Sequence, residues 1–298
     1  MRAQMAATLN DLFAEDPRLV MILADISAGY FDQAMDAFPD RCVNVGIMEQ
    51  TAVSVAAGFA LEGFIPVFHS IAPFAVERPF EQWKDDFAYQ GLGGNVISVG
   101  ASYDYGTDGM THFAPGDVPI LLSLPGMEVV VPGTAAEFDT LFRQSYADGA
   151  PTYYRLSTQP NRQDRHVEFG KLDVVRTGSQ ATVVAIGPML DRTIEAVRGL
   201  DLTVVYCTTL SPFDHAGLRR VSPLSANGAH RIVLVEPYLE GTLTNAIVSA
   251  LRPEPVRIEA IGVPRQVLSQ YGSPDEHDAA LGLTAAGIRR CVEALLAD

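Results

Sequence analysis

The sequence predicts an α/β fold of two domains, each a mostly parallel β-sheet covered by helices. Short, uninterrupted apolar runs alternate with helical patterns through both halves of the chain, as in parallel sheets that are buried on both faces. The chain also has 298 residues, more than one hydrophobic core usually organises, and an irregular polar stretch lies near its middle. We therefore predict a first domain at 1–162, a linker at 163–178 and a second domain at 179–298.

The apolar runs that predict strands in the first half are short. They occupy 19–26, 65–70, 95–100, 127–133 and 152–157. An amphipathic helix is expected at the N-terminus, and apolar residues at helical spacing predict further helices at 49–63, 77–90 and 134–149. The last helix has the clearest boundaries, because Thr134 precedes it as a cap, Glu137 stands three residues on and Gly149 ends it.

The second half repeats this alternation of strands and helices. Strands are predicted at 181–187, 202–214, 231–237 and 256–264. Helices are predicted at 189–200, 241–251 and 283–298. A second parallel sheet with helices on its faces follows from this order.

Charge and composition exclude several classes of protein. The formal net charge is -15 and the Lys and Arg residues are not clustered, so we expect no nucleic acid partner. No stretch approaches about 18 apolar residues and the N-terminus lacks the core of a signal peptide, so we expect no membrane span and a cytoplasmic location. The cysteines (Cys42, Cys207 and Cys291) are too scattered for a disulfide framework or a zinc site, and we expect no metal ligands in this chain.

Polar side chains follow the predicted strands of the first half, where ligands bind in open parallel sheets. Asp25 follows the first strand, His69 ends the second, and the glycine-rich loop after the third carries Asp108 and His112. Rossmann, P-loop and serine-hydrolase fingerprints are absent, so these four residues are the candidates for a substrate site. The alternative for Asp108 and His112 is that the acid caps a turn of the loop and the histidine lies at the surface without a ligand.

A single carboxylate, Glu49, begins the small and apolar helix at 49–63. The residues alone leave two interpretations open. The acid could interact with the positive end of the helix dipole, or it could be a desolvated active-site group.

Three motifs of the first half share their order and spacing with one protein family. NVGIMEQ-x-AVSVAAGFALEG-x-IPV, FEQWKDDFAYQ and GTDGMTH resemble the pyrimidine-binding domain of transketolases and their thiamine-diphosphate relatives. The second half resembles the transketolase C-terminal domain, so the resemblance covers nearly the whole chain.

The resemblance implies a role for Glu49 in binding thiamine diphosphate. A carboxylate bonded to the ring nitrogen of the aminopyrimidine favours the imino tautomer, which can take the proton from C2 of the cofactor. Phe74 matches an aromatic residue that stacks on this ring. Ile71 and Glu77 stand where the family has two further aromatic residues, and Ile71 can still pack against the ring.

The resemblance also implies substrate contacts. Asp108 and His112 match an acid and a histidine that contact the hydroxyls and carbonyl of a ketose donor. Gly100 and Thr158 stand where the family has the His and Arg that bind a sugar phosphate. We therefore expect a donor other than a standard sugar phosphate, or a phosphate site supplied by a partner.

The family's Mg²⁺-binding GDG motif, with an Asn about 25–30 residues further on, is absent from this sequence. The resemblance therefore implies the C-terminal half of a split enzyme. A separate N-terminal-type subunit would bind the diphosphate and hold Mg²⁺, with the active site between the two chains in an α2β2 particle.

The leading hypothesis is a subunit of a transketolase-like enzyme that transfers a two-carbon ketol unit. One alternative is the β subunit of a 2-oxoacid dehydrogenase-type decarboxylase, which shares the domain pair. The paired Asp and His of GTDGMTH favour the transketolase. Another alternative is a non-catalytic scaffold subunit, and an intact Glu49, Asp108 and His112 argue against it.

Overall fold

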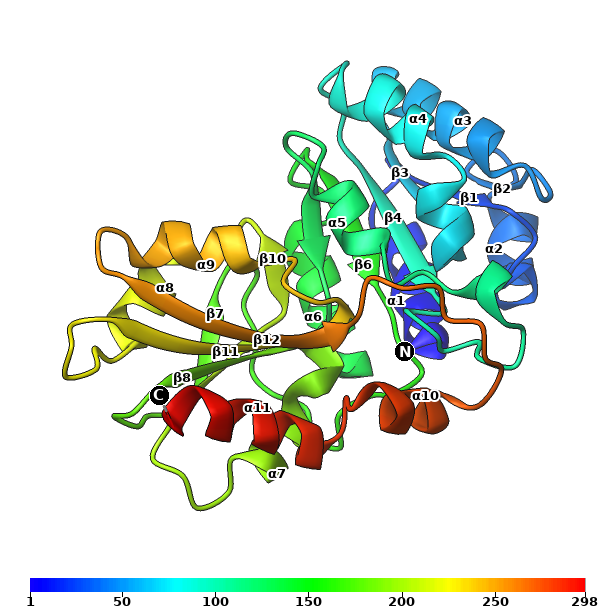
Figure 1. The fold of residues 1–298 in the computed structure, drawn as a ribbon. Coiled ribbons are helices and arrows are strands. Elements are labelled where there is room, and N and C mark those ends of the chain that lie inside the picture. The colour runs from blue at the N-terminus through cyan, green and yellow to red at the C-terminus, as the bar shows by residue number, and fades with distance from the viewer. Residues whose placement is uncertain (298) are drawn as a thin grey trace.

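Two β-sheets organise the structure, the first formed mainly by the first half of the chain and the second by the second half (Figure 1). This computed structural model describes residues 1–297. The first sheet has seven strands and the second has five. In chain order the strands are β1 (Leu19–Leu23), β2 (Cys42–Asn44), β3 (Ile65–Ile71), β4 (Gly94–Val99), β5 (Glu128–Val130), β6 (Pro151–Arg155), β7 (Leu172–Arg176), β8 (Thr182–Ile186), β9 (Thr203–Cys207), β10 (Thr209–Ser211), β11 (His230–Leu239) and β12 (Val256–Val263).

The strand order confirms the predicted fold class. It is β10-β5-β6-β4-β3-β1-β2 in the first sheet and β12-β11-β8-β9-β7 in the second. Within residues 1–297, the antiparallel pairs in these sheets are β10 with β5 and β7 with β9, and the other pairs are parallel. Strands β1, β4, β6, β8 and β9 are buried along their whole length, as expected for sheets covered on both faces.

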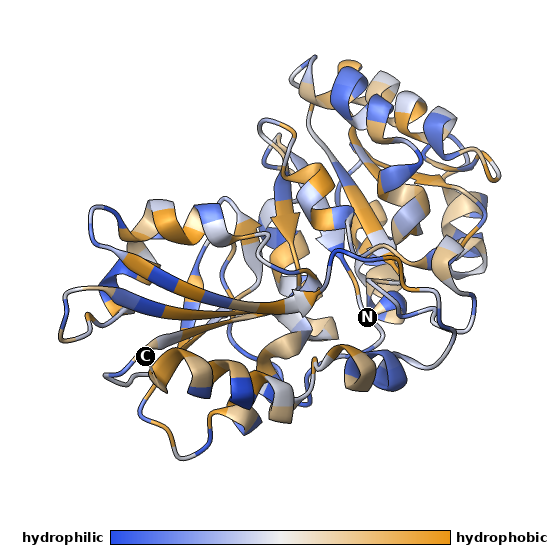
Figure 2. Cartoon of the chain, in the orientation of Figure 1, coloured by the Kyte–Doolittle hydropathy of each residue, from blue (hydrophilic) through white to orange (hydrophobic). Residues whose placement is uncertain are grey.

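Helices cover both sheets, and Figure 2 shows apolar residues concentrated on the strands and hydrophilic residues on outer helix surfaces. No helix within residues 1–297 is both long and apolar enough to span a membrane. The α-helices are α1 (Arg2–Glu15), α2 (Asp32–Ala37), α3 (Glu49–Leu61), α4 (Phe80–Gln82), α5 (Asp117–Leu121), α6 (Ala135–Ser145), α7 (Leu190–Ala196), α8 (His215–Val221), α9 (Thr244–Leu251), α10 (Pro274–Leu281) and α11 (Ala285–Ala297). The other helical turns are η1 (Ala28–Tyr30), η2 (Pro73–Glu77), η3 (Trp83–Ala88), η4 (Met110–His112) and η5 (Gly187–Met189).

The two helices predicted with the most detail have different outcomes. Helix α6 begins as expected, because the side chain of Thr134 accepts the Glu137 N–H at 3.3 Å. The helix predicted at 77–90 is instead divided into the π-helical turns η2 and η3 with α4 between them. Pro79 lies at this division and has no N–H to continue a regular helix.

Two predicted segments differ from the structure in their strands. The segment 163–178, expected as a linker, includes β7, a half-buried edge strand of the second sheet. The strand predicted at 202–214 is divided into β9 and β10, and β10 pairs with β5 of the first sheet. The second half of the chain therefore completes the first sheet, which local sequence patterns cannot specify.

A buried network at the end of β6 joins the two halves. The Arg155 Nε donates to Asp117 Oδ2 at 2.7 Å, and Tyr153 OH donates to the same oxygen at 2.7 Å. The Arg155 Nη2 donates to Ser102 Oγ at 2.7 Å, and Ser102 in turn donates to the carbonyl of Pro237 in the second half. Arg155 and Asp117 are at most 1% exposed, so each buried charge is stabilised by the other and removal of one would leave the other uncompensated.

Replacing Asp117 with Asn should destabilise the protein strongly, because the Arg155 charge would remain buried without its counter-ion. We expect the free energy of unfolding to fall by about 3–5 kcal/mol, measured by urea denaturation. Asp85→Asn is the matched control, since the Lys84–Asp85 pair is about half exposed and its loss should cost less than about 1 kcal/mol. Equal effects of the two substitutions would contradict this prediction.

Candidate functional site

Glu49 is the first residue of α3 and its side chain is 2% exposed. The two residues before it, Ile47 and Met48, are exposed at 68% and 54%. The helix behind it buries the small residues Ala52 and Ala56 against the first sheet. The acid therefore lies at the boundary between the core and an apolar surface, where a carboxylate needs a polar partner.

Arg78 is that partner in this structure. Its Nη1 donates to Glu49 Oε2 at 2.7 Å, and its guanidinium lies 4.1 Å above the centre of the Phe74 ring. The same ring meets the imidazole of His112 edge-on, with 5.3 Å between ring centres. Glu49, Phe74 and His112, three residues that are distant in sequence, thus form one group.

The loop between β4 and η4 brings His112 to this group. It leaves the sheet at Gly100, whose φ of +78° suits glycine, and the ring of Tyr105 fills the space beside it. The Tyr105 ring also lies edge-on to His112 with 6.4 Å between ring centres. Asp108 is exposed on the same loop, and its N–H donates to the carbonyl of Tyr105 at 2.9 Å.

Ile71 and Glu77, which stand where the resembling family has two further aromatic residues, flank Phe74 in the sequence. Ile71 ends β3, is half-buried, and its side chain borders Gly100. Glu77 ends η2. Partial burial, with a smaller contribution from the Asp117 carboxylate, raises the pKa of Glu77 to about 7.

His69 lies in the interior, 0% exposed, beneath the loop that follows β1. Its Nδ1 is 2.7 Å from the carbonyl of Ile97, so this nitrogen carries the proton and Nε2 accepts from the Ser27 hydroxyl at 2.7 Å. Arg2 Nε donates to the same Ser27 oxygen at 2.7 Å. Burial lowers the pKa of His69 to about 4, so the ring is neutral at pH 7. Both ring nitrogens are used, and His69 supports the loop instead of facing a ligand.

Asp25 lies on this loop and is exposed. Its φ of 68° and that of Ser27, 64°, are uncommon for residues other than glycine and occur often at functional sites. Asn44 Nδ2 donates to Asp25 Oδ1 at 3.1 Å. Asp25 and His69 therefore belong to a second group at the end of β1, next to β2.

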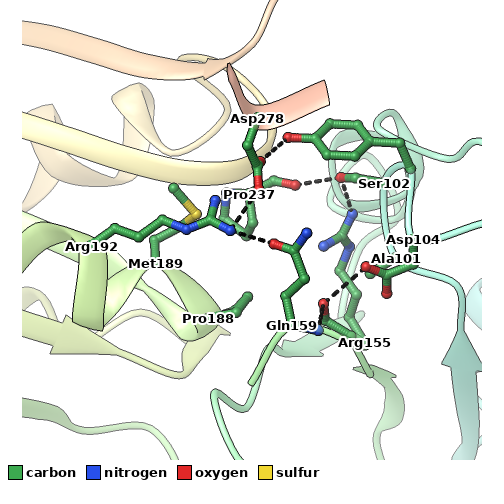
Figure 3. Close-up of a pocket in the computed structure, with 12 residues that line it drawn as sticks. Ala101, Ser102, Asp104, Arg155, Gln159, Pro188, Met189, Arg192, Pro237 and Asp278 are labelled. Carbon is green, nitrogen blue, oxygen red and sulfur yellow. Dashed lines mark hydrogen bonds and ion pairs between the residues drawn. The ribbon is translucent and has the colours of Figure 1, made fainter. Parts of the chain in front are cut away.

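Asp104 lies near the start of the same loop and connects it to the residues that follow β6. Its carboxylate accepts the Thr158 N–H at 2.8 Å and the Ser157 hydroxyl at 3.2 Å. Burial raises the pKa of Asp104 to about 6. Asp104 and Arg155 line a small cavity of about 20 Å³ between the two halves of the chain, together with residues of the second half (Figure 3).

Sequence reasoning identified Glu49, Phe74 and His112 but assigned no role to Arg78, Asp104 or Tyr105. Arg78 stands 29 positions after Glu49, in a segment predicted as regular helix, and no spacing rule connects them. Asp104 and Tyr105 were visible as polar residues of the glycine-rich loop. Their partners, at Thr158 and Gly100, depend on how the strands of the sheet are ordered.

Glu49 and its neighbours are suited to bind the aminopyrimidine end of a cofactor. A buried carboxylate that can bond a ring nitrogen stands beside an aromatic ring, Phe74, that remains half-exposed. Within residues 1–297, no cluster of three or more His, Cys, Asp or Glu side chains is placed to hold a metal ion.

The comparisons with known proteins agree with this fold. Residues 1–163 match the transketolase pyrimidine-binding domain, and residues 170–288 match the transketolase C-terminal domain. The fold is thus that of the pyrimidine-binding and C-terminal pair of domains. The chain belongs to the transketolase family.

Two curated relatives have nearly the same length as this chain. One is an uncharacterized 33.6 kDa protein in the fasciation locus of Rhodococcoides fascians, 40% identical over 97% of this chain and 92% of its own. Another is the 6-deoxy-6-sulfo-D-fructose transketolase subunit SqwH of Clostridium sp. (strain MSTE9), 31% identical over 95% of this chain and 91% of its own. A solved structure described as a split gene transketolase, an inactive beta4 tetramer, is 28% identical, with a TM-score of 0.82, over 99% of this chain and 97% of its own.

Replacing Arg78 with Met should destabilise the free chain, because Glu49 would stay buried without a cation. The pair is partly open to solvent, since Arg78 is 37% exposed, so we expect a loss of only about 1–2 kcal/mol in urea denaturation. Lys84→Met is the matched control and should change stability by less than about 0.5 kcal/mol, because both partners of that pair are exposed. An Arg78→Met variant as stable as the wild type would mean that Glu49 does not depend on Arg78.

Acidification should destabilise the protein through His69. The pKa of His69 is lowered in the folded state, so its stability contribution is complete above the unfolded pKa of about 6.5 and is lost as the pH falls toward 4. Between pH 7 and pH 5 this group should cost about 2 kcal/mol of unfolding free energy. In His69→Gln, the fall in unfolding free energy between pH 7 and pH 5 should be smaller by this amount, so the slope of stability against pH should be shallower. An unchanged slope would contradict the prediction.

Proposed function

We propose that this chain is the pyrimidine-binding subunit of a split, thiamine-diphosphate-dependent transketolase-like enzyme, and that it transfers a two-carbon ketol unit. The observation that carries the proposal is the buried Glu49 at the start of α3, connected through Arg78 to Phe74 and through Phe74 to His112. The similar lengths of the two curated relatives and of the split-gene structure support the division into subunits.

The chain's own residues have distinct tasks in this proposal. Thiamine diphosphate supplies a carbanion equivalent when it is bound. Glu49 would bond the ring nitrogen of the bound cofactor, and its Oε1 is available for this because Arg78 donates to Oε2. Phe74 would provide the face against which that ring packs, and burial of Glu49 would strengthen its hydrogen bond by excluding water.

His112 and Asp108 recognise the ketose donor. Both lie on the same loop: the His112 ring contacts Phe74, and Asp108 is exposed beside Gly109. A histidine that donates to the donor's carbonyl and an acid that accepts from a hydroxyl suit a polyhydroxylated substrate. Asp25, exposed at the end of β1, is the further candidate for this contact.

The diphosphate and Mg²⁺ would be held by a separate subunit, which carries the pyrophosphate-binding domain. We expect an α2β2 particle in the cytoplasm, with the active site between the two kinds of chain. The exposed Ile47 and Met48 beside Glu49 support contact with a partner at this edge.

The donor in this proposal is not a standard sugar phosphate. The positions of the family's phosphate-binding His and Arg are Gly100, covered by the Tyr105 ring, and Thr158, whose N–H is bonded to the Asp104 carboxylate. A carboxylate at this point disfavours a phosphate by like-charge repulsion. One relative is named for 6-deoxy-6-sulfo-D-fructose, a name without a phosphate. Phosphate ligands supplied by the partner subunit are the alternative.

Glu49→Gln should lower the rate of ketol transfer at least about a hundredfold while leaving assembly intact. The amide keeps the shape of the side chain but cannot serve as an acid. Activity should be measured with the chain co-expressed with the product of its neighbouring gene, and assembly by size-exclusion chromatography. Full activity in the Gln variant would rule out this role. Consumption of 2-oxo acids with release of CO2, instead of ketoses without it, would favour the decarboxylase alternative.

Calorimetric titration of thiamine diphosphate with Mg²⁺ tests the division of the site directly. We expect binding to the co-expressed complex and none to this chain alone. Tight binding to the single chain would overturn the split site, and no binding in either case would favour a scaffold subunit.

A further inference from the structure

The segment between β12 and α10 crosses from the second domain onto the first. Figure 1 shows this stretch, in orange, leaving the end of β12 and running across the first domain before it enters α10. It carries Tyr271 and Gly272, and α10 carries His277 and Asp278. We name residues 271–278, which are the end of this stretch and the first part of α10, the crossing segment.

The crossing segment contacts the middle of the loop 103–113. The Gly272 N–H donates to the carbonyl of Gly106 at 3.1 Å. The ring of Tyr271 lies against Gly109, where a Cβ atom would be 2.5 Å from a ring carbon. Thr107 and Asp108 stand between these two glycines, so both sides of Asp108 are fixed by the second domain.

The crossing segment also contacts both ends of that loop. The His277 ring stacks on Tyr103 with 5.0 Å between ring centres and meets Phe113 edge-on at 5.2 Å. Tyr103 OH donates to Asp278 Oδ1 at 2.5 Å. Asp278 is held in turn by an ion pair with Arg192 at 2.5 Å (Figure 3).

The remaining ring contacts of the loop are made within the first domain. His112 meets Phe74 and Tyr105, and its own ring contacts do not include the crossing segment among the described residues. The loop backbone therefore connects the second domain to His112 and Asp108.

We propose that the crossing segment is a positioning element for Asp108 and His112, with Gly272 and Tyr271 as its principal residues. The second domain thereby determines the geometry of substrate recognition without contacting the reacting atoms. This inference rests on the proposed function for the roles of Asp108 and His112. The contacts themselves are independent of it.

Gly106→Ala tests the close approach directly. The new Cβ would lie 2.1 Å from the carbonyl oxygen of Gly272, and Gly106 is not among the glycines with positive φ, so the substitution displaces the segment without straining φ at residue 106. Gly58→Ala is the matched control, because nothing lies within 4 Å of a Cβ atom at that exposed position of α3.

Hydrogen–deuterium exchange of residues 103–113 is the first measurement, made on the chain alone. We expect exchange in this loop to be at least about tenfold faster in Gly106→Ala and unchanged in Gly58→Ala. Exchange equal to wild type in Gly106→Ala would overturn the proposal, since the loop would then be ordered without the crossing segment.

The second measurement uses the complex co-expressed with the neighbouring gene's product. Gly106→Ala should lower kcat/KM for the ketose by at least about tenfold while the affinity for thiamine diphosphate changes less than about twofold. Faster loop exchange with unchanged kcat/KM would overturn the positioning role.

Tyr271 gives a second pair of variants that avoids the core. The side chain is 73% exposed, so Tyr271→Ala should fold normally and lower kcat/KM, whereas Tyr271→Phe should retain the wild-type value. Equal activity of the Ala variant and wild type would count against the proposal. If the wild-type complex transfers no ketol unit, the proposed function fails, while the exchange experiment still decides whether the crossing segment holds the loop.

Discussion

The burial of one carboxylate, Glu49, is the constraint on which the arrangement of the site depends. A charge that is 2% exposed needs a partner, and Arg78 supplies it across a 2.7 Å hydrogen bond. To reach Glu49, Arg78 leaves a π-helical turn and lies over Phe74, so the acid, the cation and the ring are fixed together. The same ring receives His112, which extends the group to the glycine-rich loop.

That loop is ordered from two directions, and this is how the two halves of the chain cooperate. Within the first domain, Asp104 accepts the N–H of Thr158, which follows β6, and the Tyr105 ring fills the space over Gly100. From the second domain, Gly272 and the residues of α10 contact the loop at its middle and both ends. The second sheet contributes further through β10, which completes the edge of the first. A site built entirely from first-domain side chains thus depends on packing between domains.

Three polar residues of the first domain lie at or after strand ends but differ in exposure and in their hydrogen bonds. Asp25 and Asp108 are exposed and available to a ligand, whereas His69 is buried and bonded at both nitrogens. The rule that ligands bind at the carboxyl ends of strands identified all three. It could not separate them, because the loop with Ser27 covers His69, and the unusual φ angles at Asp25 and Ser27 that shape this loop are not visible in the residue types.

The sequence by itself determined the α/β fold class, most strands and the cap of α6, because these follow from local periodicity and short capping motifs. Glu49, Phe74 and His112 were predicted as site residues from motifs that resemble those of a family. Tertiary structure alone decided the partner of Glu49, the transfer of β10 to the first sheet, the strand β7 in the expected linker, and the support of the loop by residues 271–278. Each of these is a contact between segments distant in sequence. Such contacts are selected by the packing of the whole chain, so no local pattern of residues specifies them.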